Sequence, residues 1–217
     1  MVKPNDEVGP SPVTGLRGRR AVQAAQTRME ILAAARRQFV TNGYAATNMK
    51  EIAAAAGVSV QTVYDSVGSK PELVRRLNDL IDVEAGIAEI AMTVPGEMDP
   101  LVLAVVPARI TRRLIERCGD IVRASIDGSR ADPGLVDVSQ EGRRRHRLGA
   151  RAVAQRLDTL RALEPMTVDA AATTIAMLAD VRVALALIDD HAFTLDDVEA
   201  WIGTTTTRAL LLDDRPR

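Results

Sequence analysis

The chain has 217 residues, with 28 Lys and Arg against 29 Asp and Glu and a formal net charge of -1. A chain of this length can bury a hydrophobic core without disulfides or metal ions, and its single cysteine, Cys118, excludes an internal disulfide. Its two histidines, His146 and His191, lie far apart with no ligand set at metal-binding spacing, so the sequence predicts neither a metal site nor a cofactor.

Residues 1–21 are expected to form a disordered, basic lead. Their prolines and glycines come with too little apolar content to offset the entropy of ordering. Residues 1–70 carry nine Lys and Arg against five Asp and Glu, which favours an anionic partner for this part alone, nucleic acid before membrane. The first residues contain no hydrophobic core of the kind a secretory signal carries, so none is expected, and no apolar stretch is expected to reach the roughly 18–20 residues of a membrane span. A cytoplasmic protein without membrane contact is therefore predicted.

Residues 22–68 are predicted to form a three-helix domain, with helices over residues 27–42, 49–56 and 60–67. Apolar residues of the first helix recur at three- and four-residue spacing, which is one face of a helix. Gly43 and Gly57 supply C-terminal stops, while Thr47 or Asn48, and then Ser59, supply N-terminal caps.

Residues 69–217 are predicted to form a larger helical domain, with helices over residues 70–87, 100–118, 120–127, 133–163, 167–190 and 194–212. Gly, Pro and Asp separate these segments, and none alternates with period two for long enough to indicate a strand. The predicted fold class is all-α, with about nine helices in an N-terminal and a larger C-terminal domain.

Residues 168–187 are nearly apolar all round, so most sides of that helix must be covered. The last helix carries an apolar face formed by Val198, Trp201, Ile202, Thr205, Ala209 and Leu210. The two helices can pack as a pair against the same pair of a second chain, which predicts a homodimer through the helices near 167–190 and 194–212. The alternative is that both helices fill the core of a monomer.

The stretch AAAAGVSVQTVYD, residues 53–65, changes character at Gly57. A short helix, a turn whose glycine accepts positive φ and a second short helix form a helix-turn-helix, whose second helix lies in the DNA major groove. Val58 and Val63 are expected to face inward, which leaves five outward residues: Ser59, Val60, Gln61, Thr62 and Tyr64. Glutamine can pair with an adenine edge, hydroxyl groups reach bases or phosphates, and valine meets a thymine methyl.

The residues of this stretch belong to a longer sequence pattern that continues on both sides of the turn. It reads Thr27, Ile31-Leu32, Ala34-Ala35, Phe39, Gly43-Tyr44, Thr47, Glu51-Ile52-Ala53, Ala56-Gly57-Val58-Ser59, Thr62-Val63-Tyr64 and Ser69-Lys70. This pattern resembles, without a gap over residues 27–74, the DNA-binding domain of the TetR family of bacterial transcriptional regulators. The rest of the chain resembles the family only in being all-α and of suitable length.

The resemblance implies a contact with double-stranded DNA for each outward residue. Thr47, Tyr64 and Lys70 would lie on the phosphate backbone, and Ser59, Gln61 and Thr62 would face base edges. Lys50 and Val60 are counted with the same DNA-binding residues. Gly57 would be structural. In the alternative interpretation, Thr47 and Ser59 only cap helices, Tyr64 only packs its ring and Lys70 is only solvated.

Residues 65–67 depart from the family pattern. Members commonly carry an aromatic residue just before the Gly/Ser-Lys pair, where this chain has Val67, and Asp65 places an acid close to the DNA side. The departure bears on the DNA contact of that loop, while the fold tolerates Val67 as a core side chain. Ahead of the first helix, a flexible basic arm of Arg17, Arg19 and Arg20 can enter a minor groove, or is a solvated tail.

The resemblance further implies a ligand-responsive regulator that is not an enzyme: a repressor released from a near-palindromic operator by a small, largely apolar effector. Filling of the pocket would move the helix at 70–87 and spread the two DNA-binding heads of a dimer. Only five aromatic residues occur, so an aliphatic or compact apolar effector is favoured over a flat dye. The pocket residues are not identified.

Several arginines of the C-terminal domain have two interpretations. Arg109, Arg112 or Arg113 can meet an acidic group of the effector, or be solvated. The cluster from Arg143 to Arg147, with Arg151, is interpreted as a solvated or interdomain face that pairs with acids of a neighbouring helix.

Two other classes of function compete with a DNA-binding regulator. An enzyme has little support because no GxGxxG, P-loop, HExxH or GxSxG motif occurs and neither histidine has a nearby nucleophile. A helical adaptor that binds protein through the N-terminal domain is the second, and heparin would leave its partner binding unchanged.

Overall fold

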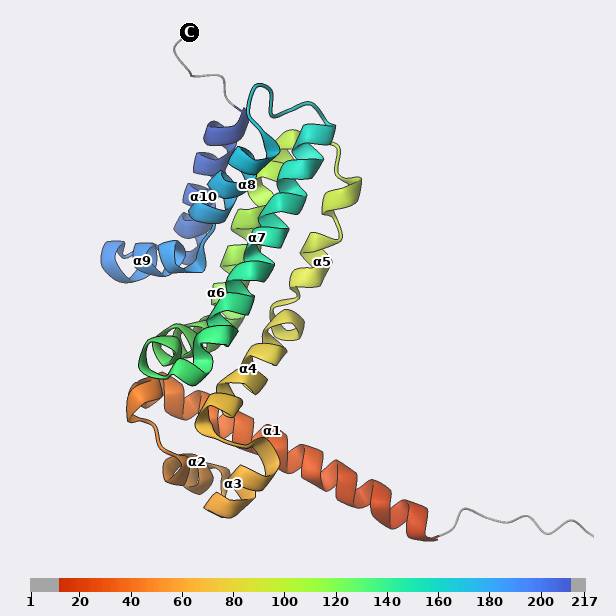
Figure 1. Cartoon of the computed structure of the whole chain (residues 1–217), viewed down its shortest axis with the longest axis vertical. Coiled ribbons are helices and arrows are strands. Elements are labelled where there is room, and N and C mark those ends of the chain that lie inside the picture. The colour runs from red at the N-terminus through yellow and green to blue at the C-terminus, as the bar shows by residue number, and fades with distance from the viewer. Residues whose placement is uncertain (1–11, 212–217) are drawn as a thin grey trace, which may run out of the picture.

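The computed structural model describes residues 12–211, and within this range no strand occurs. Its elements, labelled in Figure 1, are α1 (Pro12–Ala46), α2 (Met49–Ala56), α3 (Val60–Val67), α4 (Lys70–Ala85), α5 (Ile87–Ala91), η1 (Val94–Gly96), α6 (Pro100–Ala131), η2 (Pro133–Leu135), α7 (Val136–Thr159), α8 (Val168–Leu178), α9 (Val181–His191) and α10 (Leu195–Leu211). The predicted all-α fold class is confirmed.

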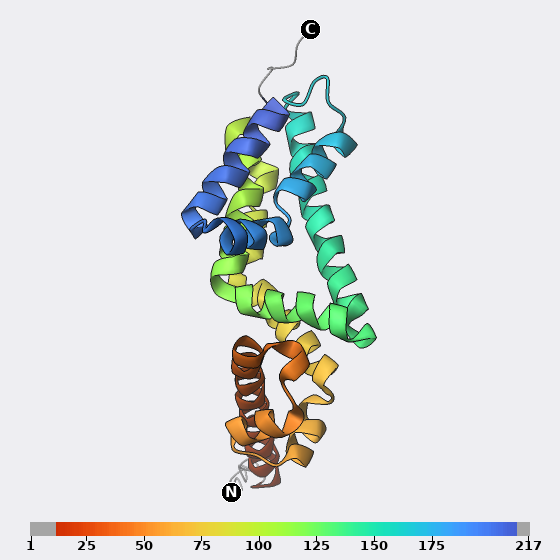
Figure 2. The ribbon, with the colours of Figure 1, turned by 90° about the vertical axis from the view of Figure 1, so that its left-hand side faces the viewer.

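The helices fall into two groups along the long axis of the molecule. Helices α1, α2 and α3 gather at one end, α6, α7, α8 and α10 pack together at the other, and α4 leads from one group to the other (Figures 1 and 2). One hydrophobic cluster joins Ile31 of α1 to Leu77 of α4 and Ile121 of α6, and a second contains Leu103 and Ile175. Because the first cluster continues into α4, the domain boundary expected after residue 68 stays a prediction.

Helix α1 begins further toward the N-terminus than the sequence suggested. Its backbone is helical from Pro12, so residues 12–21 are not the expected disordered lead, while residues 1–11 lie outside the described residues. Residues 21–26, AVQAAQ, contain no glycine or proline and five good helix formers, three alanines and two glutamines, which favours continuation of the helix. At the other end, Gly43 with φ 74° interrupts the helix at the predicted stop.

Two helix boundaries differ from the prediction. The break predicted after residue 118 is a kink inside α6, where Cys118 has φ -134° and ψ 15°. The single helix expected over 167–190 is divided, because Asp180 caps α9 by accepting a hydrogen bond from the Arg182 backbone N–H at 2.8 Å. The buried Thr111 hydroxyl donates to the Ala179 carbonyl at 2.9 Å, which satisfies a backbone acceptor at the end of α8.

Residues 168–191 have the length and composition of a membrane span, with a mean hydropathy of 1.8. The expectation that no apolar stretch reaches this length is therefore wrong. Only 33% of the apolar window is buried inside the chain, and the stretch forms two separate helices, α8 and α9. Most of its other apolar side chains are half-buried, and three are exposed: Ala170, Met177 and Ala186.

Helix α10 uses its apolar face differently from the prediction. Val198, Ile202 and Leu210, expected to meet a second chain, are buried within this one. The reason is its close packing on α6, where a side chain on Gly203 would meet Val105 at 3.3 Å. Trp201, Thr205 and Ala209 of the predicted face are half-buried, so this side of α10 stays partly open to another molecule.

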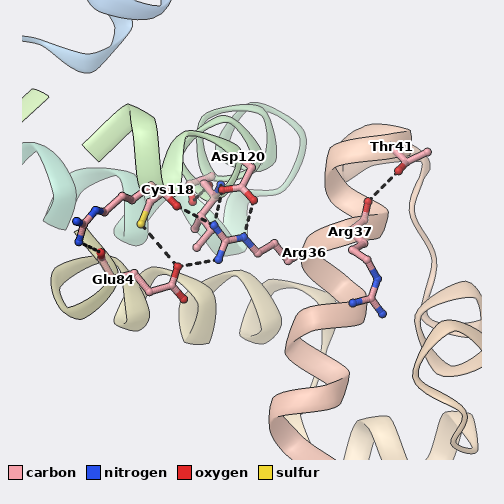
Figure 3. A network of polar contacts seen from close by, with 9 residues as sticks. Arg36, Arg37, Thr41, Glu84, Cys118 and Asp120 are labelled. Carbon is pink, nitrogen blue, oxygen red and sulfur yellow. Dashed lines mark hydrogen bonds and ion pairs between the residues drawn. The ribbon is translucent and has the colours of Figure 1, made fainter. Parts of the chain in front are cut away.

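Arg36 of α1 joins the N-terminal helices to α4 and α6. Its Nε and Nη2 donate to the two carboxylate oxygens of Asp120 (2.5 and 2.9 Å), its Nη1 donates to Glu84 (2.7 Å), and Nη2 also donates to the Arg117 carbonyl (2.9 Å), as Figure 3 shows. Arg117 and Cys118 lie at the kink of α6, so the guanidinium supplies donors where regular helix bonding is interrupted. The hydrogen bond with Asp120 raises the pKa of Arg36, which keeps this junction charged.

Candidate nucleic-acid interface

The turn between α2 and α3 is built from backbone hydrogen bonds around one left-handed glycine. Gly57 has φ 68° and ψ 27°, its N–H donates to the Ala54 carbonyl (3.2 Å), and the Val58 N–H donates to the Ala53 carbonyl (3.0 Å). This pair of bonds is a Schellman helix end, which requires the conformation that glycine adopts at least cost. The turn therefore fixes the angle at which α3 leaves α2.

Caps on both sides hold the two short helices in place. Asn48, rather than Thr47, caps α2, and Glu51 completes a capping box by accepting from the Asn48 N–H at 3.3 Å. Ser59 caps α3, where its hydroxyl accepts from the Thr62 N–H at 3.0 Å. Each cap is worth about 1 kcal/mol, which matters for helices of only eight residues.

The two faces of α3 divide as expected. Val63 is fully buried and Val58 packs against the same cluster, whereas Ser59 and Gln61 are exposed and Tyr64 keeps 48% of its surface. Val60 and Thr62 are half-buried, and Lys50 of α2 is exposed. The helix therefore presents a polar surface with one large ring to solvent, while its DNA contacts stay a prediction.

Hydrogen bonds already organise this polar surface. The hydroxyl groups of Ser59 and Thr62 lie 2.8 Å apart, and the Gln61 amide donates to Asp65 at 2.7 Å. Asp65 is thus the partner that holds Gln61 in the unbound chain. A Gln61 amide that pairs with a base must leave this carboxylate.

Two residues expected on phosphates lie elsewhere. Thr47 is 2% exposed, and its hydroxyl donates toward the carbonyls of Gln38 (3.0 Å) and Gly43 (2.8 Å), so it closes the end of α1. Lys70 Nζ lies 4.2 Å from the centre of the Tyr44 ring and 3.3 Å from the Ala45 carbonyl, and burial lowers its pKa. In this conformation both residues contact the end of α1, where Thr47 is buried and Lys70 is half-exposed, and their phosphate contacts stay a prediction.

The basic arm is part of a helix. The backbone of residues 17–20 belongs to α1, and the side chains of Arg19 and Arg20 are exposed, so the expected flexible arm is corrected to a helical extension that reaches past α3 in Figure 1. The side chain of Arg17 lies outside the described residues.

Sequence reasoning missed two arginines that hold the end of α3. Arg28 Nε donates to the Ser66 carbonyl and Arg76 Nε donates to the Val67 carbonyl, both at 3.2 Å. These bonds support the loop in which the chain departs from the family pattern. No local signal identifies Arg28, because its partner lies 38 residues away in the sequence.

The arginines of the C-terminal group are mostly paired. Arg112 lies 2.7 Å from Asp196 and 3.0 Å from Glu199, and Arg113 lies 3.6 Å from Glu89, whereas Arg109 is exposed. These ion pairs link α6 to α10 and α5, so Arg112 and Arg113 serve helix packing.

Comparison with known proteins places these features in a family. Residues 31–77 match the family model described as bacterial regulatory proteins, tetR family. The SmeT–triclosan complex is similar in fold, at 23% identity over 87% of this chain and 93% of that one, with a TM-score of 0.69. NalD of Pseudomonas aeruginosa, described as the secondary repressor of the MexAB-OprM multidrug efflux pump, matches at 21% identity over 88% and 98%, with a TM-score of 0.68.

A putative TetR-family regulator from Syntrophomonas wolfei matches at 15% identity, over 88% of this chain and 99% of that one, with a TM-score of 0.71. No curated protein matches the chain. The structural matches extend over the C-terminal helices as well, so both helix groups share the fold of these regulators.

Proposed function

We propose that this chain, a member of the TetR family of bacterial regulatory proteins, is a cytoplasmic transcriptional repressor that a small, largely apolar effector releases from a near-palindromic operator. The observation that carries the proposal is the helix-turn-helix of residues 49–67, whose second helix presents exposed Ser59, Gln61 and Tyr64 beside exposed Lys50. The family consists of DNA-binding regulators rather than enzymes, and binding of an effector fits the SmeT–triclosan relative.

We assign distinct roles to the exposed residues of this surface. Gln61 is proposed to read a base edge once it leaves Asp65, and the Ser59 and Thr62 hydroxyl groups and the Val60 side chain are proposed to lie along the same groove. Tyr64 and Lys50 are proposed to contact phosphates, which position the domain without reading sequence. The exposed Arg19 and Arg20 of α1 are proposed to meet the backbone beyond the recognition helix.

Gln61→Ala and Tyr64→Phe are expected to separate these roles. Removing the Gln61 amide should reduce discrimination against the wrong base by about 1–3 kcal/mol at one position of each half-site. Removing the Tyr64 hydroxyl should weaken binding to the operator and to its single-base variants alike, by about three- to tenfold, because the substitution deletes one hydrogen bond to a phosphate. Fluorescence anisotropy with single-base operator variants at several salt concentrations measures both effects.

Two outcomes of that experiment contradict the proposal. Unchanged base preference in Gln61→Ala would remove its role in reading the operator. Binding that ignores salt concentration would contradict phosphate contact altogether, because released counterions make such binding fall steeply with salt. A helical adaptor predicts this second outcome together with a protein partner that heparin does not displace.

We propose that two copies associate through the outer face of α8 and α9 and the free side of α10. Ala186 of α9 is exposed and Trp201 of α10 is half-buried, so part of the apolar surface of these helices is left uncovered by its own chain. Burial of such a surface in a four-helix contact provides the hydrophobic driving force for a dimer. The two DNA-binding heads then face the two halves of a palindromic site.

Ala186→Glu is expected to weaken the dimer at least about tenfold, because a two-fold contact buries the new carboxylate twice. Val83→Glu is the matched control, since Val83 of α4 is also an exposed apolar residue, at 81%, outside this face. Sedimentation equilibrium at micromolar concentration compares the two variants with the parent chain. Equal dimer mass for both would place the contact elsewhere.

A further inference from the structure

A groove of about 580 Å³ lies between α7 and α8 and reaches the start of α9. Its volume lies within the roughly 300–1,000 Å³ of small-molecule sites. Its apolar wall includes Leu148 of α7, Ala172 and Ala176 of α8 and Met177. His146 Nε2 donates to the Ala176 carbonyl at 2.8 Å, which ties the two helices together alongside the groove.

The remaining lining is strongly cationic. Five arginines and His146 line the groove against only two acids, Asp169 and Asp180. Those acids are already engaged, with Arg151 at 2.7 Å and Arg182 at 2.6 Å. Burial alone would raise the pKa of Asp180, but hydrogen bonds from Arg182 lower it overall, so this acid stays ionised in its pair.

Two of the groove arginines have no acidic partner in the described part of the chain. Arg143 donates only to the Ser139 hydroxyl, at 2.5 Å, and Arg147 forms no ion pair with any carboxylate of residues 12–211. Both also line an adjoining hollow of about 380 Å³ on α7. The arginine cluster, which the sequence suggested as a solvated face, thus contains two arginines without a carboxylate partner in the described residues. Both lie beside the apolar wall of the groove.

We propose that this groove binds a small amphipathic anion, with a carboxylate or phosphate head on Arg143 and Arg147 and an aliphatic tail along Leu148, Ala172 and Met177. Guanidinium groups hold such heads through paired charge-assisted hydrogen bonds. The groove lining contains no Phe, Tyr or Trp side chain, so its wall suits an aliphatic tail rather than a stacked ring. This inference rests on the proposed function and gives the effector its chemical class and its place.

The same helix face connects the groove to the DNA-binding part. Glu141 of α7 accepts from Arg144 (2.8 Å) and Arg145 (2.9 Å), and Arg145 also pairs with Asp82 of α4 at 2.6 Å. Arg75 of α4 also pairs with Asp137, near the start of α7, at 2.8 Å. An anion held by Arg143 and Arg147 lies on the same helix as these ion pairs, so its binding is expected to shift the contacts that hold α7 on α4.

The test is isothermal titration calorimetry of the full chain with decanoate, decyl phosphate and, as the uncharged control, decanol. At least one anion is expected to bind about tenfold or more tightly than decanol, and whichever head binds more tightly identifies the preferred anion. Arg147→Gln should weaken anion binding about tenfold by deleting a charge-assisted hydrogen bond, and the Arg143→Gln, Arg147→Gln double variant should weaken it further. Arg109→Gln, an exposed arginine of α6 outside the groove, should leave it unchanged.

Each other result overturns the inference. Equal binding of decanol and the anions, no binding at all, or an equal loss in Arg109→Gln places any ligand elsewhere. A monomeric Arg147→Glu variant would mean that a second copy covers the groove.

Operator affinity is measured in parallel. Tight operator binding without anion binding overturns only the groove, whereas absence of operator binding overturns the proposed function. Anion binding that leaves operator affinity unchanged removes the link through Glu141.

Discussion

Arg36→Met is expected to lower the free energy of unfolding by about 2 kcal/mol. The guanidinium bonds to both Asp120 and Glu84, and its loss leaves two carboxylates close together with no cation between them. Breaking a fully buried pair costs roughly 3–5 kcal/mol. The expected value is smaller because 27–36% of the surface of each side chain remains exposed to solvent, which screens the charges. Urea unfolding followed by circular dichroism measures the difference.

Arg37→Met is the matched control, because Arg37 is the next residue of α1, its side chain is exposed, and it points away from the Arg36 junction in Figure 3. Its effect should stay within about 0.5 kcal/mol. Equal destabilisation in both variants would show that the junction adds nothing beyond the ordinary cost of replacing an arginine.

The effect of Arg36→Met is expected to depend on pH. Burial alone would raise the pKa of Asp120, but the hydrogen bond and charge of Arg36 lower it below its ordinary value. A carboxylate with a lowered folded-state pKa contributes its stability above the unfolded value near 3.9 and loses it as the pH falls through the folded value. The difference between parent and variant should therefore be complete at pH 6 and shrink below about pH 4. A difference that is constant from pH 6 to pH 3 would contradict the ion pair.

Gly57→Val is expected to destabilise the N-terminal helices by about 2 kcal/mol and to weaken operator binding at least about tenfold. A Cβ at this position would meet nothing within 4 Å, so the cost is one of backbone conformation alone. Valine is strained at φ 68°, where a β-branched side chain is a marked outlier. Relaxation of that strain would turn α3 away from its position on α2.

Gly57→Asn separates this cause from a simple loss of glycine. Asparagine tolerates the left-handed region, so this variant should lose less than about 1 kcal/mol and keep most of its operator affinity. Thermal unfolding and anisotropy on the same preparations test both variants. Equal behaviour of the valine and asparagine variants would show that positive φ at residue 57 does not govern the turn.

The sequence was most informative where structure is decided locally. Gly57, Ser59 and the stop at Gly43 each act through their own backbone or a neighbour within a few residues, and all three lie where the pattern predicted. The burial of Val63 follows in the same way from helical periodicity. The all-α fold could therefore be predicted from capping residues and spacing.

Other features depend on partners that are distant in the sequence. Thr47 was assigned to a phosphate, but carbonyls of the preceding helix occupy its hydroxyl. Lys70 packs on Tyr44, 26 residues earlier, and Val198, Ile202 and Leu210 of α10 are buried within their own chain. No periodicity distinguishes a face that meets its own chain from one that meets another, so these assignments required the folded arrangement.

Asp180 also affects how the chain behaves during synthesis, before it folds. As synthesis proceeds, residues 168–191 have the hydropathy of a membrane span before α7 and α10 pack against any part of them. Asp180 and Arg182 lie at the middle of that stretch, and each charge opposes insertion at the bilayer centre by about 2.5–3.5 kcal/mol. The carboxylate that ends one helix and starts the next thus also disfavours capture of the nascent segment by the insertion machinery, at a stage when no tertiary contact can yet do so.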